Sequence, residues 1–424
     1  MLQAFFNKVS ILFRDPSLRK RVLFVLAIFA VFRLLSTIPI PGVDHGALAG
    51  FVGGNQFFGL LNIFSGGALS QLSIVMLGVG PYITASIIMQ LLTVMVPNLK
   101  EMYHHEGEAG RKKFSQISRY LTVPIAAIQG FGLLLLLTQQ GIITSLGITG
   151  TIVNMIIIIA GALLVTWLGE LISEFGISNG VSLLIFAGIV AILPNSIAQL
   201  IANYDPSQLP LYLGFVVLAF IIIAGIVAVT EAERPVPVVY AKQSRGGKTY
   251  GGTSTYIPLR INMAGVMPII FALSILLFPQ MLANFFMNGT SVGLQNVGQF
   301  INQLLSNGWF YPIVYFILVF VFTYFYTAIT FEPESMAENL QKSGAFIPGV
   351  RPGKATTDYI STIANRITFV GALFLGVIAV IPIIIQSITG VQSFAIGGTS
   401  LLIVVAVVID LVKKMDAQVS MRQY

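Results

Sequence analysis

The chain has 424 residues, of which 56% are hydrophobic and only 9% are charged, and its mean hydropathy is +0.88. A soluble domain carries about 25% charged residues, so 23 basic and 16 acidic side chains cannot cover the surface of a soluble protein of this length. Soluble globular, disordered and coiled-coil classes are therefore excluded, and we expect the outer surface to face lipid. The chain contains no cysteine, which excludes disulfides and thiolate chemistry.

Ten apolar runs are long enough to cross a membrane, because about 20 helical residues span the ~30 Å hydrocarbon core. The first run follows basic residues but precedes no small-x-small cleavage site, which favours a retained span over a removed signal peptide. In chain order the runs lie at 22–40, 72–96, 120–139, 151–169, 181–201, 211–230, 261–282, 310–330, 367–388 and 394–412.

An eleventh uncharged stretch, at 51–71, is broken by Asn, Gln and five glycines, and the basic residues decide whether it spans. With ten spans and the N-terminus inside, 22 of the 23 Lys and Arg residues lie on the inner side, and Arg33 lies within the first run. The positive-inside rule predicts this bias. A crossing by 51–71 would move every later basic loop outside, so we expect this stretch to be re-entrant or on the outer side, with both termini cytoplasmic.

Two inner loops, at about 231–260 and 332–366, are far longer than the ~2–8 residues typical between bundle helices. They are rich in charge and contain Pro and Gly, which favours a docking surface. A basic inner face suits anionic lipid headgroups, RNA or an acidic protein surface. The expected organisation is therefore a cytoplasmic amphipathic segment at 1–21, two halves at 22–205 and 206–412, and a cytoplasmic tail at 413–424.

Two short motifs each occur twice, five spans apart. Residues 78–85 and 265–272 both read G-V-x-P-x-I-x-A, and residues 180–185 and 398–403 both read G-x-S-L-L-I. Five is an odd number, so the second half enters the membrane from the opposite side. The sequence thus predicts inverted repeats related by an axis in the membrane plane.

Matching positions of inverted repeats converge near the midplane, and these positions are aliphatic. No acid, Lys or His falls near any midplane, so the ion and proton sites of pumps are not expected there. A ring of aliphatic side chains would form a hydrophobic constriction, a deformable seal around something large. The repeat nominates Ile83, Ile270, Ile185 and Ile403, and Val79 and Ile189 lie one helical turn from two of them.

Two short motifs resemble an enzyme site or a metal site, but each lacks a residue or a spacing that such a site requires. Gly247-Lys248-Thr249 resembles the end of a phosphate-binding loop, but Lys242 occupies the position of its first glycine. His104-His105-Glu106 lacks the helical spacing of H-E-x-x-H. We therefore expect no catalytic activity, no metal site and no cofactor, with any energy source residing in a partner.

Several long motifs occur in a fixed order along nearly the whole chain. They are IPIPGVD (38–44), NIFSGGALS (62–70), GPYITASIIMQLL (80–92), EGEAGRKK (106–113), ISNGVSLLIFAGIV (177–190), INMAGVMPIIFALSILLFP (261–279), PGVRPG (348–353) and GGTSLLIVVAVVID (397–410). Together they closely resemble the SecY family, the central subunits of bacterial protein-conducting channels.

The resemblance implies an all-α polytopic membrane protein with ten transmembrane helices in two inverted five-helix halves, a clamshell with a re-entrant plug at about 55–71. It implies a pore ring of Val79, Ile83, Ile185, Ile189, Ile270 and Ile403. It assigns Asn55, Phe57, Phe58, Leu60, Leu61, Ile63 and Phe64 to the plug. Polar candidates for a lateral gate between spans 2 and 3 and spans 7 and 8 are Thr84, Gln129 and Ser274.

The implied function is a channel that passes unfolded secretory polypeptides across the bacterial plasma membrane and releases transmembrane segments sideways into it. The implied partners are SecE-type and SecG-type small membrane subunits, the SecA motor ATPase, the ribosome, preproteins with their signal sequences, and anionic lipids. Docking would use Arg245, Lys248, Arg351 and Lys354. Many relatives have two adjacent basic residues at the tip of loop 231–260, whereas this chain has Gly247 and Lys248, which predicts a weaker ribosome contact.

Two other functions remain open from the residues alone. An inverted-repeat transporter of a small apolar solute would also have an uncharged midplane. An assembly scaffold without a pore would share the docking loops.

Overall fold

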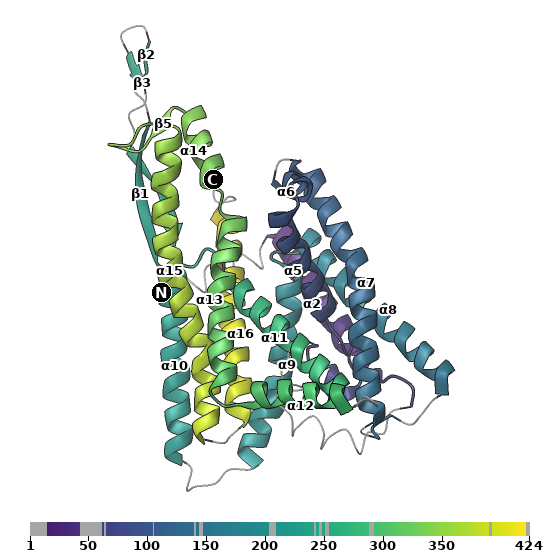
Figure 1. Ribbon diagram of the computed structural model, residues 1–424. Coiled ribbons are helices and arrows are strands. Elements are labelled where there is room, and N and C mark those ends of the chain that lie inside the picture. Colours follow the sequence, from purple (N-terminus) through teal and green to yellow (C-terminus); the bar gives the residue numbers. More distant parts are fainter. Residues whose placement is uncertain are drawn as a thin grey trace. The chain divides into compact units, whose positions relative to one another are not determined.

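The computed structural model (Figure 1) describes residues 15–42, 62, 65–104, 106–139, 141–143, 147–202, 209–240, 243–245, 248–250, 254–287, 292–389 and 392–420. The chain forms two compact units. Unit 1 comprises Met1–Phe215, Leu273–Tyr311 and Pro382–Tyr424, and unit 2 comprises Val216–Ala272 and Pro312–Ile381. These boundaries differ from those of the two repeat halves, which stay a prediction.

Helices dominate both units. Those wholly in unit 1 are α2 (Pro16–Leu35), α5 (Gly80–Met95), α6 (Pro97–His104), α7 (Gly107–Gln139), α8 (Gly147–Phe175), α9 (Gly180–Ala202), α12 (Val292–Ser306) and α16 (Gln392–Ser420), with a 3₁₀ turn, η1, at Leu69–Gln71. Four helices begin in one unit and end in the other: α10 (Leu209–Glu231), α11 (Met267–Met287), α13 (Phe310–Thr330) and α15 (Lys354–Thr389). Unit 2 also contains α14 (Pro333–Lys342).

Each of the ten apolar runs overlaps a helix, which confirms the mostly helical fold. Among the described helices, five are long and apolar enough to cross a membrane, and the pair α5 and α6, bent by 114°, would be a sixth. The count of ten spans remains a prediction. Helices α7 and α15 have 33 and 36 residues. At 1.5 Å per residue each is about 50 Å long, so each extends beyond a ~30 Å hydrocarbon core.

The second apolar run differs from the predicted helix over 72–96. Its helix α5 begins only at Gly80, and the preceding residues form turns. Their backbone pairs with the chain after α2, because Ile40 N–H donates to the Leu72 carbonyl (2.9 Å) and Ile74 N–H to the Ile38 carbonyl (2.9 Å). These hydrogen bonds replace the helical ones, so only 16 residues of this run are helical.

Within unit 1, the helices pack around α7 and α8, and one close contact to α8 requires a glycine. Helix α7 packs against α5, α6 and α8, while α8 also packs against α2 and α9, and α9 packs against α16. At Gly161 of α8 a Cβ atom would collide with the carbonyl oxygen of Ile74. The turns before α5 are therefore seated directly on the backbone of α8.

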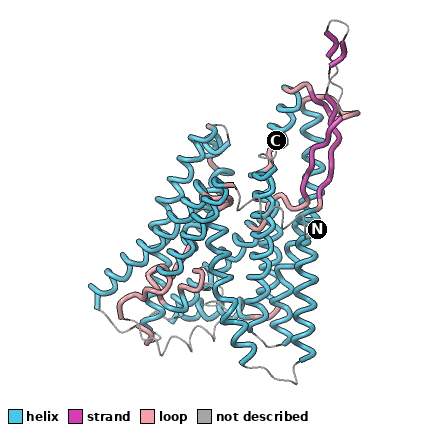
Figure 2. The backbone as a smooth tube through the Cα atoms, turned by 180° about the vertical axis from the view of Figure 1, so that it is seen from behind, coloured by secondary structure: helices cyan, strands magenta, loops and turns pink. Residues whose placement is uncertain are grey.

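The loop predicted at 231–260 is a β-structure, so the expectation of an all-α chain was wrong. A three-stranded antiparallel sheet of unit 2 has the order β4-β1-β5, formed by β1 (Glu233–Tyr240), β4 (Ser254–Arg260) and β5 (Ala345–Phe346). A second hairpin pairs β2 (Gln243–Arg245) with β3 (Lys248–Tyr250). All named strands lie in unit 2, and they are the magenta segments of Figure 2.

Alternating residues explain why this segment forms strands. Val236 and Val238 of β1 are buried, whereas the residues flanking Val236 are exposed. This period of two is typical of a strand with one buried face. The apolar runs do not reveal these strands, because the strands are short and lie outside the runs.

Candidate functional site

The two copies of the G-V-x-P motif adopt the same backbone conformation. Gly78 and Gly265 have φ values of 53° and 63°, in the left-handed region that favours glycine. In each copy a helix begins two residues later, and its second residue is proline, a residue suited to the first turn of a helix. The sequence repeat is therefore also a structural repeat at the level of local geometry.

The same geometry places two predicted pore residues equivalently. Ile83 N–H donates to the carbonyl of Val79 (3.0 Å), and Ile270 N–H donates to the carbonyl of Val266 (3.3 Å). Ile83 and Ile270 thus occupy the first turns of α5 and α11, where their side chains are almost fully buried.

The remaining predicted pore residues belong to α9 and α16. Ile185 and Ile189 lie one turn apart on α9, and Ile403 lies on α16, which packs against α9. All six predicted ring residues are at most 3% exposed. Unit 1 contains five of them, and Ile270 belongs to unit 2.

A polar cluster joins the start of α9 to α16. Ser178, in the connection before α9, donates from Oγ to Asp410 Oδ2 (3.0 Å) and accepts from Lys414 Nζ (3.2 Å). Lys414 Nζ also pairs with Asp410 Oδ2 at 2.8 Å. Asp410 is two helical turns beyond Ile403, so this Ser178–Asp410–Lys414 cluster holds together the two helices that carry Ile185, Ile189 and Ile403.

A second ion pair joins α7 to α8. Arg119 Nη2 lies 3.3 Å from Glu170 Oε2, and Ser115 Oγ donates to Glu170 Oε1 at 3.4 Å. Neither this pair nor the Ser178–Asp410–Lys414 cluster was predicted from the sequence. The only signal was the i,i+4 spacing of Asp410 and Lys414, because Ser178 is 232 residues away from Asp410.

The residues predicted to form the plug, Asn55, Phe57, Phe58, Leu60, Leu61, Ile63 and Phe64, lie outside the described residues. The end of this segment is described from Ser65 onward and is tightly packed. A Cβ atom at Gly188, beside Ile189 on α9, would collide with Gly66 Cα, and one at Gly66 would lie 2.8 Å from the Phe32 ring. Gly66 is therefore enclosed between α2 and α9.

The three predicted gate residues are half-buried, lie on three different helices and all belong to unit 1. Thr84 on α5 donates from Oγ1 to the Gly80 carbonyl of its own helix (3.1 Å). Gln129 lies on α7, which packs against α5, and Ser274 lies on α11. The structure thus brings together the helices of Thr84 and Gln129, and the gate assignment stays a prediction.

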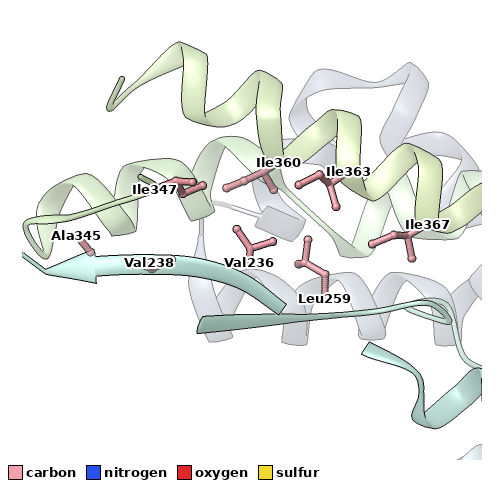
Figure 3. Close-up of a cluster of buried hydrophobic side chains, with 8 residues drawn as sticks. All are labelled: Val236, Val238, Leu259, Ala345, Ile347, Ile360, Ile363 and Ile367. Atoms are coloured by element: carbon pink, nitrogen blue, oxygen red, sulfur yellow. The ribbon is translucent and has the colours of Figure 1, made fainter. Parts of the chain in front are cut away.

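A hydrophobic core in unit 2 positions the predicted docking residues. Figure 3 shows side chains of β1 and β4 facing those of α15, with the segment around β5 beside them. The members of this core, which we term the platform core, are Val236, Val238, Leu259, Ala345, Ile347, Ile360, Ile363 and Ile367. It fixes the sheet against the N-terminal part of α15.

Arg351 and Lys354 stand at the edge of this core. Both are exposed: Arg351 lies in the turn that leads into α15, and Lys354 is the first residue of that helix. The turn is held by Thr356, whose Oγ1 donates to the Arg351 carbonyl (2.9 Å), and by Gly349 and Gly353, which have φ values of 82° and 97°. Two exposed cations are therefore presented on a rigid support.

The other two docking candidates lie on the small hairpin. Arg245 of β2 and Lys248 of β3 are register partners. Gly247 lies outside the described residues, so the predicted weakening of a ribosome contact stays untested.

Comparison with known proteins identifies the family. The SecY family model matches residues 73–412. The chain is 43% identical to "Protein translocase subunit SecY" of Streptomyces coelicolor, with 97% of each chain covered, and 40% identical to that of Mycobacterium leprae, with 100% of this chain and 99% of that protein covered.

Solved channel structures have the same fold. A structure described by "The plug domain of the SecY protein stablizes the closed state of the translocation channel and maintains a membrane seal" matches with a TM-score of 0.61 and 18% identity, and covers 92% of this chain and 90% of that chain. Sec61 in the canine ribosome-channel complex matches with a TM-score of 0.57 and 16% identity, at the same coverage. These similarities favour a non-enzymatic channel subunit over the transporter of a small apolar solute. The chain belongs to the SecY family, the multi-pass membrane channel subunits of the bacterial protein translocase.

Proposed function

We propose that Val79, Ile83, Ile185, Ile189, Ile270 and Ile403 form the constriction of a protein-conducting pore between two inverted five-helix halves. The observation that carries this proposal is the shared geometry of the two G-V-x-P motifs, which places Ile83 and Ile270 at equivalent positions. Ten spans, with both termini on the cytoplasmic side of the bacterial plasma membrane, follow from the basic loops.

An aliphatic constriction suits a substrate that varies in sequence. It excludes water and ions when its side chains are in contact, and it offers no fixed hydrogen-bonding group that a particular substrate would have to match. Unfolded secretory polypeptides meet that description. Segment 55–71 would close the outer funnel, since its described end is enclosed by α2 and by α9 next to Ile189.

Hydrophobic segments of the substrate would leave sideways through a gate. Spans 2 and 3 would form one side of this gate, and spans 7 and 8 the other. Thr84, Gln129 and Ser274 are the proposed polar positions of this gate. Their half-burial and their positions on α5, α7 and α11 support this assignment.

The platform core and its exposed cations would receive the cytoplasmic partners. Arg351 and Lys354 provide fixed positive charge for an acidic protein surface or for RNA, and Arg245 and Lys248 extend it. The partners proposed are a SecA-type motor, the ribosome, SecE-type and SecG-type small subunits, and anionic lipids at the basic face. The similar Sec61 structure is itself described in a ribosome complex.

A stalled secretory chain tests the pore directly. Because the protein has no cysteine, single cysteines at Ile83 or Ile270 can be crosslinked to one cysteine in the substrate without other changes. We expect crosslinks at both positions and none at Ile156→Cys, an exposed site on α8. Crosslinks at Ile156→Cys alone would refute the pore assignment.

A further inference from the structure

Helix α12 is an amphipathic helix that belongs to no predicted span. On a helical wheel its Leu, Ile, Val and Phe residues, apart from Val292, occupy one arc, and its Asn and Gln residues occupy the opposite arc. Figure 1 shows α12 running crosswise to α7, a long helix of the same unit. This orientation differs from that of a span.

Among the described residues, the end of α11 covers one edge of the apolar arc. Gly298 is buried, and a Cβ atom there would lie 2.7 Å from the Ala283 carbonyl oxygen and from Met287 N, at the end of α11. Three other residues of the arc are exposed: Leu294, Val297 and Phe300, by 45%, 47% and 62%. An apolar stripe of this kind needs an occupant other than water.

Charge identifies that occupant. Between Arg260 and Glu332 the sequence has no Asp, Glu, Lys, Arg or His, so nothing on α12 or near it in sequence could pair with a charged protein surface or with anionic headgroups. Trp309 follows the helix and is 71% exposed; tryptophan is enriched at the boundary between lipid and water. The next residue, Phe310, begins α13, which is a candidate membrane span.

We propose that α12 lies in the membrane interface, with Leu294, Val297 and Phe300 inserted among lipid acyl chains and its Asn and Gln face in water. Helix α13 is about 30 Å long and connects α12 to the predicted inner loop 332–366, so a spanning α13 assigns α12 to the outer leaflet. Through the contact at Gly298, the inserted helix holds the end of α11 at a fixed depth. Because the polar face is uncharged, insertion does not require anionic lipid.

The two tryptophans, Trp167 and Trp309, make the proposal measurable. In a Trp167→Phe, Trp309→Phe background, a tryptophan is introduced at Phe300→Trp or, as the matched control on the polar arc, at Gln299→Trp. The full chain is reconstituted in phosphatidylcholine vesicles that contain lipid brominated on its acyl chains. We expect brominated lipid to quench Phe300→Trp at least several-fold more than Gln299→Trp, and aqueous iodide to show the reverse order.

Two further variations complete the test. Replacing a third of the phosphatidylcholine by phosphatidylglycerol should leave the quenching by brominated lipid unchanged. The Trp167→Phe variant alone should show Trp309 quenched most by bromines near the headgroups. Iodide quenching of both Phe300→Trp and Gln299→Trp, or protection of Phe300→Trp from both quenchers by protein, would overturn the proposal. None of these readouts depends on translocation, so they stand apart from the proposed pore.

Discussion

At the scale of single residues, Gly188 determines how closely α9 approaches Gly66. A Cβ atom at position 188 has no space, because it would meet backbone rather than a movable side chain. We therefore expect Gly188→Ala to push the segment after residue 65 away from α9, at a cost of about 1–3 kcal/mol.

The measurement is the ion leak of vesicles containing the purified chain, which should rise in Gly188→Ala. Gly214→Ala on α10 is the matched control, because a Cβ atom there meets nothing within 4 Å, and its leak should stay at the wild-type level. Equal leaks in both variants would show that Gly66 and Gly188 do not contribute to the seal.

Ile403 gives a second prediction at this scale. Ile403→Asn places an amide in an apolar site, and burying it without a partner costs about 1–3 kcal/mol. A penalty of 1.4 kcal/mol on the closed state increases the open fraction about tenfold. We expect Ile403→Asn to increase the ion leak and to allow export of proteins with defective signal sequences. Val408→Asn, on the exposed side of α16, is the control for both assays. A leak as small as that of Val408→Asn would contradict a role for Ile403 in the constriction.

At the scale of elements, the Ser178–Asp410–Lys414 cluster links α9 to α16. Its ion pair is about half exposed, so we expect Asp410→Asn to lower the free energy of unfolding by only about 0.5–1 kcal/mol. The charge-reversed pair should be more stable than its two parents suggest: Asp410→Lys and Lys414→Asp should each destabilise the protein, and combining them should restore most of the loss, since Ser178 can donate and accept. Thermal unfolding of these two single variants and their double variant measures the coupling, and strictly additive losses would argue against the cluster.

The platform core provides the second prediction at this scale. Leu259→Ala removes a buried side chain between the sheet and α15, which should cost about 2–4 kcal/mol and loosen the turn that carries Arg351. Binding of a SecA-type motor to vesicles should weaken although no cation has changed. Tyr256→Ala, at an exposed position of the same strand, should bind as the wild type does. Unchanged binding by Leu259→Ala would mean that the sheet does not position the docking residues.

Sequence patterns predicted most of the helices, but they did not predict which distant residues contact each other. Ten apolar runs marked helices because spans require long uninterrupted hydrophobic segments, whereas β1 and β4 were missed because their period of two is short and interrupted by proline. The contact between Gly66 and Gly188 and the bond from Ser178 to Asp410 join distant residues, and no local pattern contains that information. The repeat was the exception, because equal motifs predicted equal local geometry at Gly78 and Gly265.

At the scale of the whole molecule, we propose that the two repeats face each other across one pore. The structure describes Ile83 in unit 1 and Ile270 in unit 2, each in the first turn of its helix. Inverted repeats related by an axis in the membrane plane bring equivalent positions together near the midplane. The distance between these two residues in the working protein is therefore the decisive quantity.

That distance can be measured by bridging paired cysteines in the cysteine-free chain. Ile83→Cys with Ile270→Cys should be joined efficiently by a short thiol crosslinker, the bridge should stop protein import into vesicles, and a stalled substrate should prevent the bridge from forming. The pair Ile156→Cys with Ile270→Cys is the control and should not be joined. If Ile83→Cys and Ile270→Cys cannot be bridged, or if import continues through the bridged protein, the two repeats do not form the pore.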